Sequence, residues 1–243
     1  MPAVPYKDSE RSKKVQVEEM FDEISSKYDL LNHLLSINID KSWRRKAIGL
    51  LKPYHPATIL DVATGTADFA VEAARLNPHS ITGIDLSEGM LKVGRQKIES
   101  KGLSGIIELR KADSENLPFN DETYDAATVG FGVRNFENLG KGLAEIFRVL
   151  KPGGIFIILE FSRPKNVLFR KLYFLYFKSV LPFMGRLVSK SDRAYTYLPE
   201  SVLEFPDGDE FVAILRTGGF INVTYKLLTL GIATIYIAQK PDS

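Results

Sequence analysis

The 243-residue sequence contains no cysteine. It therefore forms no disulfide, iron–sulfur cluster or zinc site built on thiolates, and it has no cysteine nucleophile. It also lacks an apolar run of about 18 residues, the length that a membrane-spanning helix needs. The stretch Met1–Gln16 is polar and charged, without the apolar segment of a signal peptide. We therefore expect a cytoplasmic protein.

The composition is that of an ordinary globular chain, with 44% hydrophobic and 26% charged residues. A chain of this length buries enough surface on folding to be stable without a covalent cross-link. We predict a single domain over residues 1–243. Its parts are a flexible arm (1–14), N-terminal helices (15–56), an alternating core (57–161), a helical insertion (162–206), and a C-terminal helix and hairpin (207–243).

Short apolar segments alternate with helical patterns through the middle of the chain, which is typical of a parallel sheet. After Phe161 the alternation stops, and it resumes near residue 210. The last two strands are joined by a short connection near Gly231, so we expect them to be antiparallel. The fold predicted is α/β, a Rossmann-like and mostly parallel sheet with an antiparallel C-terminal strand. The predicted strands are 58–62, 80–84, 106–109, 126–129, 155–160, 221–225 and 232–238.

A glycine and a later carboxylate indicate a nucleoside site. The first predicted strand ends in a loop that contains Asp61 and Gly65, and ligands of open α/β sheets bind beyond such strand ends. Asp85 ends the second strand, 20 residues after Gly65. At that spacing a carboxylate reaches ribose hydroxyls. We therefore predict that these three residues bind a nucleoside cofactor.

The loop after the first strand does not fit a dinucleotide. A pyrophosphate site calls for Gly-x-Gly-x-x-Gly, whereas Gly65 is the only glycine here and Asp61 and Asp68 flank it. Two carboxylates suit the cationic amino acid end of S-adenosylmethionine. Alternatively, they are only a strand-end acid and a helix N-terminal acid. Asp113, in the segment 111–119, is a candidate reader of the adenine amino group, although that segment also fits a solvated loop.

Two further motifs carry a resemblance to a known family. They are Phe-Gly-Val-Arg-Asn at 131–135 and Leu-Glu-Phe-Ser-Arg-Pro at 159–164. With them, the chain from Tyr28 to Lys240 resembles the ubiquinone/menaquinone biosynthesis C-methyltransferases, which implies a class I methyltransferase sheet. The Lys-Pro-Gly-Gly piece at 151–154 is common among methyltransferases and adds little. The other matching pieces are 28–32, 43–45, 113–119, 195–201 and 228–232.

The resemblance implies that Thr66, Asp85, Asp113 and Ser114 contact S-adenosylmethionine. Ala67 stands where the family commonly has glycine. Alanine fits there if its φ is negative, so we expect this departure to modulate cofactor affinity without abolishing binding.

The implied reaction is methylation of a ring carbon of demethylmenaquinol, for which no metal is needed. That carbon becomes nucleophilic when the adjacent hydroxyl loses its proton, so the enzyme needs a proton acceptor or groups that stabilise the phenolate. The catalytic candidates are Arg134 as a fixed cation, Asn135 as a group that orients the ring oxygen or a water, and Asp68 as a base or a partner of Arg134. A structural salt bridge for Arg134, a cap or turn role for Asn135, and His33 as the base remain alternatives.

The predicted insertion is strongly basic. Between Arg163 and Arg193 there are eight basic residues and one acidic residue. Around Arg170, leucines and tyrosines leave only a narrow basic stripe, which fits either a core-packing helix or a lid against an anionic membrane surface. The lid is the more specific hypothesis, since a polyprenyl quinol resides in the bilayer and a methyltransferase must dock there or extract it, and the core-packing helix stays an equal alternative. We find no nucleic-acid motif, and a homo-oligomer stays open.

Three rival functions remain. A methyltransferase for another small aromatic or lipid-like substrate, including the ubiquinone precursor, fits the same residues. A nicotinamide-dependent oxidoreductase is disfavoured by the single-glycine loop. A non-catalytic nucleotide-binding module would require an activity assay to exclude. Overall similarity to bacterial members of the family, without obvious ubiquinone-specific features, favours the naphthoquinol over the benzoquinol as the substrate.

Overall fold

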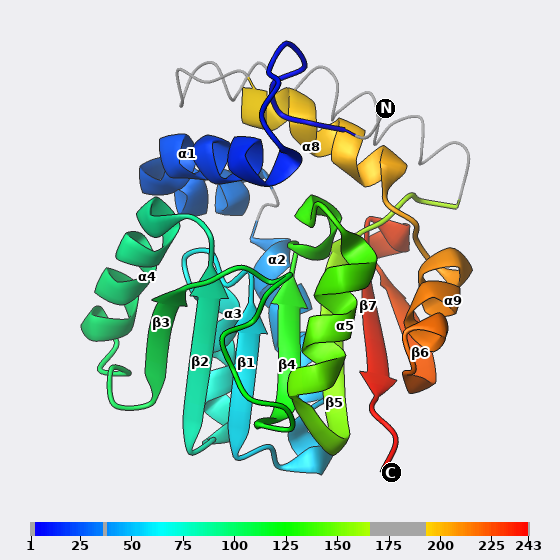
Figure 1. The fold of residues 1–243 in the computed structure, drawn as a ribbon. Coiled ribbons are helices and arrows are strands. Elements are labelled where there is room, and N and C mark those ends of the chain that lie inside the picture. The colour runs from blue at the N-terminus through cyan, green and yellow to red at the C-terminus, as the bar shows by residue number, and fades with distance from the viewer. Residues whose placement is uncertain (1–2, 36–37, 166–192, 243) are drawn as a thin grey trace.

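The computed structural model describes residues 3–35, 38–165 and 193–242. Helices and strands form a layered α/β unit (Figure 1). The helices are α1 (Lys13–Leu35), α2 (Ile39–Gly49), α3 (Asp68–Ala73), α4 (Glu88–Ser100), α5 (Leu139–Val149), α8 (Arg193–Glu204) and α9 (Asp209–Thr217). The strands are β1 (Thr58–Val62), β2 (Ser80–Asp85), β3 (Ile107–Lys111), β4 (Tyr124–Gly130), β5 (Leu150–Phe161), β6 (Ile221–Leu228) and β7 (Ala233–Gln239).

The strands form one sheet in the order β3-β2-β1-β4-β5-β7-β6. Strands β1 to β5 are parallel, and β7 runs antiparallel to both β5 and β6. The predicted fold class is therefore confirmed. β5 begins earlier than predicted, because Leu150 pairs with Tyr124 while Ile155 pairs with Ala126. The Lys-Pro-Gly-Gly segment between them is an irregularity inside the strand, not the turn before it.

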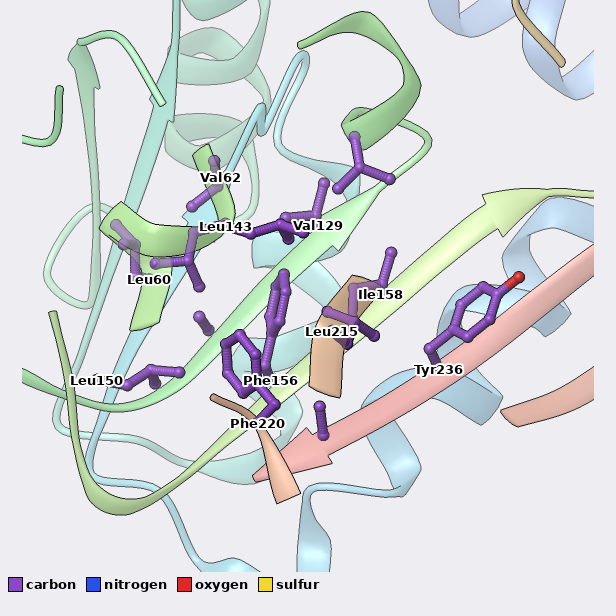
Figure 2. Close-up of a cluster of buried hydrophobic side chains, with 14 of the residues drawn as sticks. Leu60, Val62, Val129, Leu143, Leu150, Phe156, Ile158, Leu215, Phe220 and Tyr236 are labelled. Atoms are coloured by element: carbon purple, nitrogen blue, oxygen red, sulfur yellow. The ribbon is translucent and has the colours of Figure 1, made fainter. Parts of the chain in front are cut away.

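Helices cover both faces of the sheet, so the central strands are buried on both sides. The residues of β5 alternate between the two cores: Phe156 and Ile158 contribute to one, and Ile155 and Ile157 to the other. Figure 2 shows the first core, where α5 and α9 cover the sheet. Its labelled side chains are Leu60, Val62, Val129, Leu143, Leu150, Phe156, Ile158, Leu215, Phe220 and Tyr236.

The predicted N-terminal helical region is two helices, with Asn38 between them in the left-handed conformation at φ 59°. Residues of the predicted arm contact the rest of the fold. The main-chain N–H of Ala3 donates to Glu204, and that of Tyr6 donates to Gln16 Oε1 at 2.8 Å. After the loop that follows β1, α3 continues into a 3-10 turn at Ala74–Leu76.

Helices α1 and α8 lie across the edge of the sheet where β1, β2 and β4 end (Figure 1). At this edge β1 lies between β2 and β4. The connection after β1 leads to β2 on one side, and the connection after β3 leads to β4 on the other. Such a switch point is where open α/β sheets bind ligands. In the described part of the chain, no helix is long and apolar enough to span a membrane.

Candidate functional site

A hollow of about 720 Å³, its open mouth included, lies at this edge of the sheet. One wall is α1, through Val17, Phe21 and Tyr28. The loops after β1, β2, β3 and β4 supply the rest. Five of the predicted site residues line it: Gly65, Asp85, Asp113, Ser114 and Asn135.

Asp85 and Gly65 meet as their spacing predicts. The Gly65 N–H donates to Asp85 Oδ2 at 2.8 Å, and the Ser87 N–H donates to Oδ1 at 2.9 Å. Burial raises the pKa of Asp85, while these backbone N–H groups lower it. Gly65 has φ +57°, and a Cβ added there would have no heavy atom within 4 Å. The carboxylate is thus fixed at the pocket wall with acceptor positions to spare.

Asp61 lies beneath the loop and does not line the pocket. It has no exposed surface. Its two carboxylate oxygens accept hydrogen bonds from Thr64 Oγ1 at 2.6 Å and Thr128 Oγ1 at 2.7 Å. Burial raises its pKa to about 6. This placement does not support the predicted direct contact with a cofactor, because the side chain is used to join the loop to β4.

Thr66 and Asp68 are also turned away from the pocket. Thr66 Oγ1 donates to Asp29 on α1 at 2.5 Å. Asp68 accepts from Lys97 Nζ at 2.6 Å, and Lys97 also pairs with Asp29 at 2.7 Å. Arg44 lies 3.6 Å from the other oxygen of Asp68. The structure therefore places Asp68 in an ion-pair network between α1, α2 and α4, and does not bring it together with Arg134.

Helix α1 is fastened to the sheet edge next to the pocket. Lys14 Nζ lies 2.7 Å from Asp113 Oδ2 and 3.4 Å from Glu115. Ser87 Oγ donates to Asp22 at 2.5 Å. Both the predicted adenine reader, Asp113, and the loop after Asp85 are thus held by groups of the N-terminal helix.

The loops around the pocket hold non-glycine residues in the left-handed region, which is uncommon and concentrates at functional sites. They are Ala63 at φ 52°, Ala67 at φ 66° and Phe131 at φ 59°. The condition under which alanine fits here, a negative φ, is not met, because Ala67 closes the turn into α3, where its N–H bonds to Thr64 O at 2.9 Å. The left-handed conformation costs an alanine about 1–2 kcal/mol.

Arg134 is held by a buried carboxylate, Glu160. The guanidinium Nη1 lies 2.7 Å from Oε1 of Glu160, which is fully buried. Arg134 Nη1 also donates to the carbonyl of Phe131. Burial raises the pKa of Glu160, and Arg134 acts against that. The Nε donor of Arg134 is buried and has no hydrogen-bond partner among the described residues.

Asn135, the next residue, is held in place by contacts from α1 and α8. It ends the 3-10 turn Val133–Asn135. The hydroxyl of Tyr197, on α8, donates to Asn135 Oδ1 at 3.1 Å. Lys13 Nζ donates at 3.0 Å to the carbonyls of Arg134 and Phe136, so both α1 and α8 hold this turn.

An aromatic cluster continues from the pocket wall. The rings of Phe131 and Phe161 lie 4.5 Å apart, and that of Trp43 is 6.2 Å from Phe131. The Arg134 guanidinium lies 5.5 Å from the centroid of the Phe161 ring. Phe131 itself lines the pocket. The pocket therefore combines a polar side, lined by Asp85 and Asp113, with an aromatic wall near Asn135.

Glu160, Tyr197 and Lys14 also belong to this site, although none of them was predicted from the sequence. Glu160 had a signal, because an acid inside an otherwise apolar strand needs a buried partner. Tyr197 and Lys14 had none, since their partners are 62 and 99 residues away in the chain. The side chain of His33 and residues 166–192, which hold most of the basic stripe, lie outside the described residues.

The fold defines a structural class, the Rossmann-like sheet of class I methyltransferases, with strand order β3-β2-β1-β4-β5-β7-β6. A possible histamine N-methyltransferase from Thermotoga maritima superposes with a TM-score of 0.66, covering 91% of this chain and 99% of that one at 21% identity. The [4+2]-cyclase SpnF gives a TM-score of 0.67 over 95% and 97% of the two chains at 17% identity. At these identities the likeness concerns the fold alone.

The sequence comparisons narrow the class to a family. The model of the ubiE/COQ5 methyltransferase family matches residues 8–240. The demethylmenaquinone methyltransferase of Bacteroides fragilis is 48% identical, over 97% of this chain and 96% of its own length. The ubiquinone/menaquinone biosynthesis C-methyltransferase UbiE of Geotalea daltonii is also 48% identical, over 97% and 100%. The chain belongs to the ubiE/COQ5 methyltransferase family.

Membership confirms the predicted enzyme class, a C-methyltransferase that uses S-adenosylmethionine. The residues present fit that cofactor. Asp85 keeps acceptor positions at the pocket wall after binding two backbone N–H groups. Gly65 leaves open space beside it, and Asp113 offers a second carboxylate across the pocket.

Proposed function

We propose that this chain methylates a ring carbon of demethylmenaquinol, giving menaquinol. The observation that carries the proposal is the position of Asn135 at the pocket wall, next to an arginine that a buried glutamate holds. Those groups suit an aromatic ring that carries a reactive oxygen. Relatives named demethylmenaquinone methyltransferase support the naphthoquinol. Others, named for both quinones, keep the ubiquinone precursor as the second candidate.

In this proposal the cofactor occupies the β1–β2–β3 side of the pocket. Asp85 accepts hydrogen bonds from the ribose hydroxyls, which suit an unphosphorylated ribose. Asp113 and Ser114 read the adenine, and Gly65 lets the main chain approach the ligand. Asp61 and Thr66 support the loop from behind, one through Thr64 and the other through Asp29.

The quinol ring enters beside Phe131, with its reactive oxygen toward Asn135. A quinol carbon becomes nucleophilic as charge from the adjacent oxygen spreads into the ring, so groups that stabilise a phenolate raise the rate. Arg134 supplies a fixed positive charge, and Glu160 keeps its guanidinium in one place. S-adenosylmethionine, when bound, supplies an electrophilic methyl carbon on a sulfonium. The protein adds alignment of the two reactants.

Contact with an anionic membrane surface and a cytoplasmic location stay predictions from the sequence. The basic residues that support the membrane contact fall mainly in 166–192. The test is co-sedimentation with anionic vesicles. We expect the parent chain to pellet and an Arg170/Lys171/Lys178→Glu variant to stay in solution, whereas equal pelleting would contradict the prediction.

The substrate assignment is tested by initial rates of transfer of a labelled methyl group to two short-chain quinols, both kept reduced. One is demethylmenaquinol and the other is the benzoquinol precursor of ubiquinone. We expect the naphthoquinol to be methylated faster. Faster transfer to the benzoquinol would reassign the substrate within the family. Transfer to neither, with S-adenosylhomocysteine still raising the melting temperature, would overturn the quinol proposal.

A further inference from the structure

The amide of Asn135 has a defined orientation, set by Tyr197. Tyr197 is 3% exposed, and its hydroxyl donates to Asn135 Oδ1 at 3.1 Å. Burial raises the pKa of that hydroxyl above its ordinary value, so it stays protonated and remains a donor. A side-chain amide has one oxygen that accepts and one nitrogen that donates. With the oxygen engaged by Tyr197, the Nδ2 amino group is what Asn135 has left for the pocket that it lines.

The main chain at Asn135 is equally constrained. Its N–H bonds to the Gly132 carbonyl at 2.9 Å, and Lys13 holds the carbonyls on either side of the residue at 3.0 Å. Among the described residues, Asn135 Nδ2 has no hydrogen-bond partner, whereas Oδ1 accepts from Tyr197. Exchanging the two ends of the amide would turn Tyr197 from a donor into an acceptor, whereas in the structure it is Oδ1 that faces the hydroxyl.

Asn135 offers the pocket a donor, and the cation of Arg134 lies directly behind it. Two carboxylates, Glu115 and Glu137, also line this wall. Both are bound to Lys14 of α1: its Nζ lies 3.4 Å from Glu115, and its main-chain N–H donates to Glu137 Oε1 at 3.4 Å. Arg134 carries only N–H groups, and its Nε lacks a partner within the described part of the chain. Asn135 adds an N–H₂ group at the wall. Hydrogen-bond donors stabilise a negatively charged oxygen more than they stabilise a neutral hydroxyl. They therefore lower the pKa of a bound phenol.

We propose that Tyr197 is a positioning residue that makes Asn135 a hydrogen-bond donor to the substrate's ring oxygen, so that the site binds this oxygen as an anion. The inference rests on the proposed function and deepens it. Asn135 then neither accepts the hydroxyl proton nor orients a water that does. Helix α8 thus contributes to catalysis through the hydroxyl of Tyr197.

The first test exchanges the pocket-facing group of Asn135. Asn135→Asp keeps the shape and the acceptor for Tyr197, but replaces the donor nitrogen with a carboxylate oxygen. We expect kcat for demethylmenaquinol to fall at least about 100-fold, with the affinity for S-adenosylhomocysteine, measured by calorimetry, within about twofold of the parent. A variant that keeps or exceeds the parent rate would show that Asn135 acts as an acceptor and would overturn the proposal.

The second test removes the positioning hydroxyl. In Tyr197→Phe the acid limb of the kcat/KM–pH profile should move up by about 1 pH unit, because a freed amide stabilises the anion less. Tyr236→Phe is the matched control. It removes another buried hydroxyl, which accepts from the Gly208 N–H at 2.7 Å and does not line the pocket. We expect its limb to stay at the parent pH.

A limb that is unmoved in Tyr197→Phe, or that moves equally in Tyr236→Phe, would overturn the positioning role. The two levels of the account are separable. A parent chain that methylates no quinol contradicts the proposed function, and this inference falls with it. A parent chain that is active, with both variants unaffected, contradicts the inference alone.

Discussion

The guanidinium of Arg134 and the carboxylate of Glu160 form a buried ion pair at 2.7 Å, directly behind the pocket wall. The side chain of Arg134 is 6% exposed and that of Glu160 is not exposed at all. A lone charge at this depth would be costly, so each residue requires the other. Glu160 lies on β5 and Arg134 on the turn after β4, and the pair therefore fixes the turn that also carries Asn135.

Glu160→Gln should lower both activity and stability. The variant leaves Arg134 as an uncompensated buried cation, which costs about 3–5 kcal/mol, and frees its guanidinium to turn away from the substrate. We expect kcat to fall more than about tenfold, with S-adenosylhomocysteine still bound. Methyl transfer and thermal melting measure the two effects, and a variant with parent kcat would contradict the role given to Glu160.

Asp85→Asn should weaken binding of the cofactor and have little other effect. An amide retains one acceptor for Gly65 or Ser87 but loses the charge that strengthens hydrogen bonds to the ribose hydroxyls, a change of about 1.5–3 kcal/mol for charged groups. We expect roughly a 10- to 100-fold loss of S-adenosylhomocysteine affinity by calorimetry. Glu88→Gln is the control, since Glu88 is an exposed neighbour that pairs with Arg95. Similar losses in both variants would argue against a specific role for Asp85.

Lys14→Met should loosen the closure of α1 over the cofactor. Lys14 is partly exposed and pairs with Asp113 at 2.7 Å, so its contribution is that of a screened ion pair. We expect S-adenosylhomocysteine affinity to fall about 2–5-fold at low salt, and less at high salt. Lys7→Met, which removes an exposed pair with Glu200, should leave the affinity unchanged. An effect that is the same at all salt concentrations would contradict an electrostatic origin.

Asp61 should make stability fall as pH rises between about 4 and 6. Its folded pKa is raised to about 6 by burial, so between its unfolded and folded pKa values the native state binds more protons than the unfolded state. Asp61→Asn removes this titration. Relative to the parent, the variant should gain about 2 kcal/mol of unfolding free energy from pH 4 to pH 7. Denaturant unfolding at both pH values measures this, and a pH-independent difference would contradict it.

Patterns of neighbouring residues in the sequence were sufficient to predict the strands and the contact between Gly65 and Asp85. Alternating apolar segments predicted every strand of the sheet, and the interval from Gly65 to Asp85 predicted a contact that is present at 2.8 Å. The same loop also shows where such rules end. Asp61 and Asp68 flank Gly65 in sequence, yet one is buried under the loop and the other pairs with Lys97. Which side of a tight turn a side chain takes depends on φ values that the sequence does not state.

Arg134 and Asn135 were recognised through a family motif, but the groups that orient them were not. Tyr197 comes from α8 and Glu160 from β5, and each contact depends on tertiary packing rather than on chain neighbours. At Ala67 the preference of the residue type was a poor guide to the backbone conformation. The turn into α3 imposes φ 66°, so the backbone geometry prevails over the preference of alanine for negative φ.

The central claim is methyl transfer to a reduced quinol ring, and the most direct measurement compares the two redox states of one compound. Short-chain demethylmenaquinone is offered with labelled S-adenosylmethionine, either held reduced or left oxidised. The account predicts label in the naphthol ring only under reducing conditions, because only the quinol has an oxygen that can push charge into the ring. Equal labelling of the oxidised quinone, or no labelling of either form by a chain that binds S-adenosylhomocysteine, would contradict it.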